Sequence, residues 1–222
     1  MTATPVWTVL VPTLGERRPL FKRLMAGLMP QVDQHGGAVR VAGWYNNGAP
    51  SLPKIRQSMV EAAESEYVSF VDDDDVVSSN YVDAVMSALA TRPDYVGFQV
   101  QCYSNGAPTG IAYHSLEFDR WRNLRGRYER DISHINPIRA SLARRADFRM
   151  VGGGRAEDRA WADQLRRGRV LRTQVVIPEI LYHYLHTTPD HATGSRWRDP
   201  RAIRPGARAT VDSPNFTWSD RD

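Results

Sequence analysis

The chain has 222 residues, an apolar fraction of 41% and a formal net charge of +4, values that are typical of a folded globular protein with a sizeable core. Its one cysteine, Cys102, excludes an internal disulfide and any cysteine-cluster zinc site. No apolar run reaches the roughly 18 residues that a membrane span needs and the N-terminus lacks a signal-peptide pattern, so we expect a soluble, cytoplasmic protein with no transmembrane segment.

Apolar runs alternate with amphipathic segments along the first half of the chain. Strands are expected at Val6–Pro12 and Val39–Tyr45, each buried on both faces. The helix between them is expected to end near Pro30, and another helix opens at Pro53. This alternation predicts a mostly parallel, doubly wound α/β sheet with right-handed crossovers.

A run of acidic residues closes the third predicted strand. The strand begins near Glu66 and ends at Val71, directly before four consecutive aspartates, Asp72 to Asp75. Ligands bind at the carboxyl ends of strands in α/β sheets, and adjacent anions repel one another unless a cation compensates. Since Mg²⁺ is held by carboxylates together with substrate phosphates, this stretch predicts a metal and diphosphate site. The alternative is a solvated acidic turn that stabilises the N-terminus of the next helix.

The second half has a less regular pattern. Short strands alternate with arginine-rich loops up to Asn136, and from Pro189 onward the composition predicts a loop or mobile lid. The expected elements are a helix at Tyr81–Leu89, a strand at Tyr95–Val100, short strands around Ile111–Tyr113, a break at Gly152–Gly154, a helix from Ala156, and closing strands at Val170–Ile177 and Ile180–Leu185.

The order of five landmarks resembles the family 2 glycosyltransferases of the GT-A fold. They are Val-Leu-Val-Pro-Thr at 9–13, Asn-Asn-Gly at 46–48, Tyr-Val-Ser-Phe-Val-Asp-Asp-Asp-Asp at 67–75, Gly-Gly-Gly-Arg-Ala-Glu-Asp at 152–158 and Tyr-His-Tyr-Leu-His at 182–186. The most specific are the acidic strand end, which looks like the family's DxD motif, and the downstream Glu-Asp pair. The resemblance implies a single GT-A domain, Rossmann-like, with a mixed, mostly parallel sheet flanked by helices and a C-terminal extension.

The same resemblance divides the chain by role. Residues 1–93 would bind the nucleotide sugar, residues 94–188 would bind the acceptor and catalyse transfer, and residues 189–222 would form a flexible tail or lid. Because the chain ends soon after His186, we expect a single-addition transferase rather than a polymer-forming synthase. The oligomeric state is not predicted.

The resemblance also assigns residues to the donor. Asp72 would face the ribose with Asp73 beside it, and Asp74 would ligate Mn²⁺ or Mg²⁺ bridging the diphosphate. The remaining assignments are Thr13 and Glu16 at the nucleotide base, Asn46 at the nucleobase, Lys54 and Arg56 at the phosphates, Asp75 as support for the acids, and His186, or in its place His183, completing the metal shell. In this sequence Asn46-Asn47 replaces the family's more usual acidic pair, which leaves the preference for uridine open.

Asp158 matches the catalytic base of the family, with Glu157 supporting it. The base would take the proton of an acceptor hydroxyl as that oxygen attacks the anomeric carbon, which inverts the configuration. We therefore expect a metal-dependent inverting hexosyl- or pentosyltransferase that uses a nucleoside-diphosphate sugar, with a UDP-sugar as the first choice. The acceptor class is open, and an anionic acceptor or a modified DNA base are the candidates considered.

Other functions use the same residues differently. Asp72 to Val76 also resembles the nucleophile motif of haloacid-dehalogenase-type phosphatases, which normally need a later lysine, but none follows Lys54. A non-catalytic nucleic-acid-binding module would use the arginines of the second half with aromatic residues such as Trp121 and Tyr128, but it gains nothing from four adjacent carboxylates. A sugar-nucleotide pyrophosphorylase is disfavoured because no glycine-rich basic loop follows the first strand.

Overall fold

Strands and helices alternate in the first half of the chain, as the pattern predicts. The computed structural model describes residues 4–46, 50–150, 157–187 and 211–218. β1 pairs in parallel with both β2 and β3, and every β1 residue is buried, as expected for a strand covered by helices on both faces. The elements are β1 (Trp7–Leu14), a short 3-10 turn (Gly15–Arg17), α1 (Arg18–Asp33), β2 (Val39–Asn46), α2 (Leu52–Ala62), β3 (Tyr67–Phe70), β4 (Val76–Val77) and α3 (Tyr81–Leu89).

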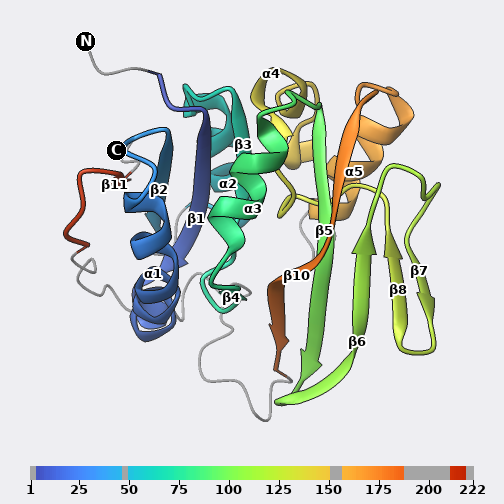
Figure 1. Cartoon of the computed structure of the whole chain (residues 1–222), viewed down its shortest axis with the longest axis horizontal. Helices are drawn as coiled ribbons and strands as arrows, with labels where there is room; N and C mark the ends of the chain where they lie inside the picture. The colour runs from blue at the N-terminus through green and yellow to red at the C-terminus, as the bar shows by residue number, and fades with distance from the viewer. Residues whose placement is uncertain (1–3, 47–49, 151–156, 188–210, 219–222) are drawn as a thin grey trace.

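The second half extends the same sheet with pairs of both orientations. β10 runs parallel to β5, whereas β6 is antiparallel to β5 and β9 is antiparallel to β3. The described strands thus form one mixed sheet in the order β11-β2-β1-β3-β9-β5-β6-β8-β7, with β10 beside β5 and β4 (Figure 1). The elements are β5 (Tyr95–Ser104), β6 (Ala107–His114), β7 (Arg122–Leu124), β8 (Arg127–Arg130), β9 (Ile138–Arg139), α4 (Ala140–Ala143), a 3-10 turn (Phe148–Met150), α5 (Glu157–Arg167), β10 (Gln174–His186) and β11 (Phe216–Trp218).

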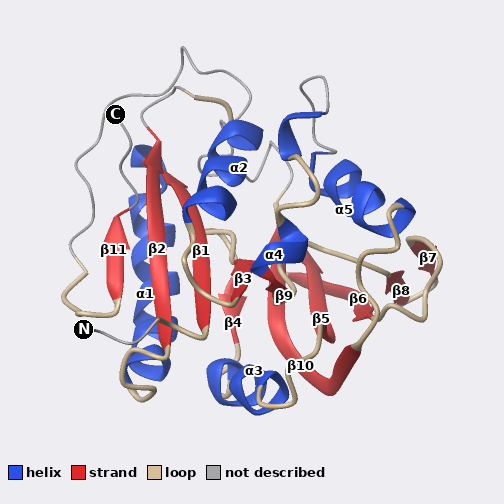
Figure 2. Ribbon diagram, turned by 90° about the horizontal axis from the view of Figure 1, so that it is seen from above, coloured by secondary structure: helices blue, strands red, loops and turns tan. Residues whose placement is uncertain are grey.

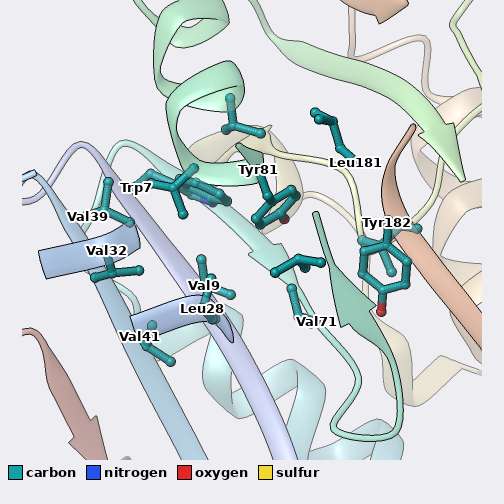
Figure 3. Packing of buried hydrophobic residues seen from close by; sticks show 14 of the residues in the cluster. Trp7, Val9, Leu28, Val32, Val39, Val41, Val71, Tyr81, Leu181 and Tyr182 are labelled. Carbon is teal, nitrogen blue, oxygen red and sulfur yellow. The ribbon is translucent and has the colours of Figure 1, made fainter. Parts of the chain in front are cut away.

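Two apolar clusters cover the two faces of the sheet. On one face α1 and α3 lie side by side (Figure 1), and their apolar side chains pack in one cluster with Trp7, Val9 and Tyr81. The rings of Trp7 and Tyr81 meet edge to face. Figure 3 shows this packing, with Tyr182 of β10 at its border. On the other face α2, α4 and α5 pack around Phe148 and Trp161, whose rings stack at 4.7 Å (Figure 2). Helices on both faces leave the carboxyl ends of β1 and β3 as the natural ligand edge.

Two elements differ from the expectation drawn from sequence. α1 continues past Pro30 to Asp33 because Pro30 faces solvent while Val32, one residue before the end, is fully buried. The two expected closing strands are one strand, β10, whose register with β5 is irregular between Val176 and Ile180. Pro178 lies in that irregular segment, and proline has no N–H to give to a sheet ladder.

The end of the chain contributes a strand rather than a loop. Residues 216–218 form β11, which pairs in parallel with β2. The expectation of a flexible tail or lid over 189–222 is therefore wrong for these residues, because the Trp218 ring stacks on Phe21 of α1 at 5.3 Å. The Asn47-Gly48 turn, Gly152–Gly154, the helix start at Ala156 and residues 188–210 lie outside the described residues.

The described helices can be compared with the length of a membrane span. Among the described residues, no helix combines the length and the apolar character that crossing a bilayer requires.

Candidate functional site

The four aspartates form a tight turn directly after β3. The Val71 amide donates to the carbonyl of Leu10 in β1, and the Asp75 amide donates to the carbonyl of Asp72 at 3.1 Å. The turn therefore lies against the end of β1, which brings Thr13 to it. The placement of the acids at the carboxyl edge of parallel strands agrees with the expectation from sequence.

Asp72 is held between two cationic or polar groups from other elements. Nη2 of Arg56 in α2 lies 2.8 Å from Asp72 Oδ1, and Nε2 of His134 lies 3.3 Å from Asp72 Oδ2. Burial alone would raise the pKa of Asp72, but the Arg56 guanidinium and then His134 outweigh it and hold this pKa well below its usual range. Asp72 is therefore ionised at neutral pH.

Asp73 points into the protein instead. Its side chain is 1% exposed, accepts a hydrogen bond from Thr13 Oγ1 at 2.6 Å and pairs with Arg17 at 2.9 Å. Burial, together with the neighbouring Asp74 and Asp72 charges, raises the pKa of Asp73 to about 7 despite Arg17 and Thr13. Thr13 and Asp73 thus fix the shape of the turn from inside, and neither side chain is presented to a ligand in the described structure.

Asp74 is the most open of the four carboxylates. Its side chain is 40% exposed and forms an ion pair with Arg17, while Arg23 of α1 donates to its backbone carbonyl. Arg17 therefore bridges two adjacent aspartates and relieves their repulsion. Asp74 is the carboxylate of the turn best placed to meet a ligand from solvent.

Asp75 ties the turn to β10. It accepts hydrogen bonds from the Tyr182 hydroxyl at 2.7 Å and from the Leu185 amide at 2.8 Å. The same hydroxyl accepts a hydrogen bond from the Asp72 amide at 3.2 Å. Burial, with the charges of Asp74 and Asp72, raises the pKa of Asp75 well above its usual range. Asp75 is thus a structural support, which is the role expected for it.

The acidic pair of α5 faces the same turn. Glu157 Oε1 lies 3.2 Å from Arg56 Nη1, and Asp158 Oδ2 lies 3.7 Å from His134 Nδ1. Because Arg56 and His134 also contact Asp72, each of them joins the turn after β3 to the start of α5. Asp158, some 80 residues along the chain from the acids, is therefore brought into one site with them.

The structure also places Lys54, Glu16 and Asn46, which the sequence analysis assigned to the donor. Lys54 is exposed, and Glu16 lies in the 3-10 turn next to Arg17. Asn46 is 3% exposed and its amide donates to the Pro50 carbonyl at 3.0 Å, which closes the loop that follows β2. Their roles toward a donor stay predictions.

Comparison with known proteins identifies the architecture. No protein-family model and no curated protein matches the chain. The structure of residues 1–349 of S. aureus TarS, a family 2 GT-A glycosyltransferase, does match, with 16% identity, a TM-score of 0.59, and 83% of this chain and 61% of that chain covered. The chain has the GT-A fold.

Two further TarS structures agree with this. TarS 1–349 in complex with UDP-GlcNAc gives 16% identity and a TM-score of 0.59 over 83% of this chain and 60% of that chain. A longer TarS structure gives 15% identity and a TM-score of 0.55 over 81% of this chain and 36% of that one. This chain therefore spans about three fifths of the length of each TarS 1–349 chain that it matches, 61% of one and 60% of the other.

Asp74 is the residue of the turn that could contribute a ligand to a divalent ion. Mg²⁺ is commonly held by one or two carboxylates plus substrate phosphates, and Asp74 offers an accessible carboxylate. In the described ranges no group of three or more His, Cys, Asp or Glu side chains is placed to hold an ion by itself. His186 is exposed with its ring 6.3 Å from that of Tyr184, and His183 contacts Ser78 at 3.3 Å. Metal binding by Asp74 and His186 stays a prediction.

Sequence reasoning missed two residues of the site. Arg17 directly follows Glu16, which the sequence analysis did select, so its place after the first strand was the available signal. His134 lies in a segment where isoleucine recurs at every third position, 132, 135 and 138, a pattern that an ordinary partly buried segment also gives. Only the folded chain brings His134 between Asp72 and Asp158.

Proposed function

We propose that this protein is an inverting glycosyltransferase that moves a sugar from a nucleoside-diphosphate sugar, with a UDP-sugar as the first candidate, to an acceptor hydroxyl. The observation that carries the proposal is that His134 brings Asp158 to Asp72 at the ligand edge of a GT-A sheet, with Asp74 two residues further along the same turn. The complex of TarS with UDP-GlcNAc supports the choice of donor. A hexosyl or a pentosyl group would each suit this chemistry.

In the proposed reaction the acceptor oxygen attacks the anomeric carbon of the donor. The new carbon–oxygen bond forms while the bond from that carbon to the diphosphate breaks, and the electron pair leaves with the nucleoside diphosphate. Asp158 accepts the acceptor's proton, and Glu157 stays paired with Arg56 beside it. Asp74 would hold Mn²⁺ or Mg²⁺, which supplies positive charge for the leaving diphosphate.

The rival functions fit these features less well. A dehalogenase-type phosphatase would need its acidic strand early in the domain, whereas β3 follows two strand–helix units. The nucleic-acid-binding alternative has one supporting observation in the second half, where Arg127 lies over the Tyr113 ring at 4.1 Å and Arg130 lies over Trp121 at 4.8 Å. We therefore keep an anionic acceptor, with DNA as its first probe, inside the glycosyltransferase proposal.

Thermal unfolding with ligands tests the donor class. A ligand that binds only the folded state at about 100 times its Kd adds about 2.7 kcal/mol of stability, which for a chain of this size is a Tm rise of roughly 5 °C or more. UDP with Mn²⁺ should raise the Tm of the wild type, and Asp74→Asn should lose the part of that rise that depends on Mn²⁺. Asp83→Asn, which changes an exposed aspartate paired with His35, should behave as the wild type.

Other outcomes of the same experiment decide against the proposal. Stabilisation by fluoroberyllate but by no nucleoside diphosphate would favour the phosphatase. Stabilisation by an oligonucleotide alone would favour the binding module. An Asp74→Asn variant that keeps the full Mn²⁺-dependent rise would remove Asp74 from the metal site.

A further inference from the structure

His134 lies between the donor-binding turn and the base that the proposed function assigns. Its side chain is 8% exposed. The ring nitrogens point to different carboxylates, with Nε2 3.3 Å from Asp72 Oδ2 and Nδ1 3.7 Å from Asp158 Oδ2. The imidazole therefore lies within 3.7 Å of a carboxylate oxygen of both Asp72 and Asp158.

The backbone around His134 is held firmly. The His134 carbonyl accepts the Phe70 amide at 2.9 Å, which attaches this segment to β3. Two residues further, Asn136 is fully buried, and its amide donates to the Val96 carbonyl of β5 at 3.1 Å. His134 is thus anchored to the sheet itself, whereas Asp158 comes from the first turn of α5.

The two contacts of the ring are unequal. The distance to Asp72 lies within hydrogen-bond range, but Nδ1 has no hydrogen-bond partner in the described part of the chain. A buried polar atom without a partner is costly, so it needs an explanation. Catalytic contacts are often long without substrate and tighten in the complex. Carboxylates only accept hydrogen bonds, so a ring that bridges Asp72 and Asp158 carries N–H at both nitrogens, and an Asp158 carboxylate that approaches by a few tenths of an ångström would accept from Nδ1–H.

We propose that His134 is a positioning residue, which orients the Asp158 carboxylate for proton removal by bridging it to Asp72. The inference rests on the proposed function, because it requires Asp158 to be the base. The bridge joins the base to the carboxylate that would face the donor. His134 itself exchanges no atom with donor or acceptor.

Two substitutions separate the two halves of the bridge. The glutamine amide nitrogen lies as many bonds from Cα as histidine Nε2, and the asparagine amide nitrogen as many as Nδ1. His134→Gln therefore keeps a donor for Asp72 and loses the contact with Asp158. His134→Asn keeps a group on the Asp158 side and loses the contact with Asp72.

Release of UDP from UDP-GlcNAc and direct binding of UDP are the readouts. His134→Gln should lower kcat roughly 10- to 100-fold, the scale of losses from a misplaced catalytic group, with KM for the nucleotide sugar and Kd for UDP within about twofold of wild type. His134→Asn should instead act mainly on KM and Kd. His35→Gln, which changes a histidine paired with Asp83 at 2.8 Å outside the site, should leave all three constants unchanged.

A double-mutant cycle separates positioning from general loss of structure. In the Asp158→Asn background His134→Gln should cause no further fall in kcat, because the group that it positions is gone. A further fall as large as in the wild type would overturn the inference, as would a His134→Gln enzyme with wild-type kcat. Wild-type protein that neither binds UDP nor releases it from UDP-GlcNAc would contradict the proposed function instead.

Discussion

At the scale of single residues, Arg56 joins the turn after β3 to the start of α5 through two ion pairs. Its side chain is 5% exposed and its two terminal nitrogens bind Asp72 and Glu157. Removing one partner from a buried ion pair leaves an uncompensated charge, which typically costs about 3–5 kcal/mol. Arg56 was expected to be a phosphate contact, but its guanidinium is already committed to two carboxylates in this structure.

Arg56→Met should therefore destabilise the fold by about 3–5 kcal/mol in urea unfolding. Arg149→Met is the matched control, because Arg149 also pairs with two acids but is half exposed, and it should change the free energy of unfolding little. If both substitutions changed the free energy of unfolding equally, the stabilising role assigned to Arg56 would be wrong.

A buried histidine predicts how stability depends on pH. Burial lowers the pKa of His114 to about 3, with Arg130 and His134 acting in the same direction against a hydrogen bond to Asn136. The unfolded chain takes up this proton below about pH 6.5, so the stability due to neutral His114 is present above pH 6.5 and is lost as pH falls toward 3.

The difference in unfolding free energy between wild type and His114→Asn should therefore shrink by about 1.4 kcal/mol per pH unit between pH 6 and pH 4. Urea unfolding of both proteins across that range measures it. A constant difference would mean that His114 is protonated in the folded protein.

Residue patterns could predict part of the site but not its cross-contacts. The acidic run after an apolar strand, and the Glu-Asp pair at a helix start, are local patterns that sequence displays directly. Arg17 and His134 act through side chains that come from other elements and meet the acids only in the fold. Such contacts have little local signal, because arginine and histidine are common in ordinary loops, and only the position of Arg17 directly after Glu16 pointed to it.

At the scale of elements, β11 shows how a short strand is stabilised by the surface on which its side chains pack. β11 carries Phe216 and Trp218 onto β2, where Gly43 lies beneath them. A Cβ at position 43 would come within 2.8 Å of both aromatic rings. The composition of the tail predicts a loop, but these two aromatic side chains supply enough apolar area to pair the strand.

Gly43→Ala should displace β11 and destabilise the protein by about 1–3 kcal/mol, as overpacking does. Gly27→Ala provides the contrast. A Cβ there meets nothing within 4 Å, so this substitution inside α1 should stabilise the fold by about 0.5–1 kcal/mol. Adding Trp218→Ala should remove much of the cost of Gly43→Ala. If the two changes in the free energy of unfolding were fully additive in urea unfolding, Trp218 would not be packing against position 43.

At the scale of the whole molecule, the alternation of strands and helices was sufficient to predict an α/β sheet covered by helices, whereas the GT-A fold was implied only by the resemblance of five motifs. Hydrophobic periodicity is strongest in the first half, and the parallel order β2-β1-β3 agrees with it. The second half depends on long-range pairing, such as β9 between β3 and β5, which no local pattern encodes. The same holds for β10, which is one strand where two were expected, with Pro178 in the irregular segment between them.

The central claim is that Asp158 removes a proton in a donor site built on the acids after β3. The most direct test compares wild type and Asp158→Asn in UDP release from UDP-GlcNAc and in calorimetric binding of UDP with Mn²⁺. The account predicts that Asp158→Asn lowers kcat by about 10²–10⁴-fold while Kd for UDP stays within about twofold of wild type. An Asp158→Asn enzyme with wild-type kcat would contradict the account.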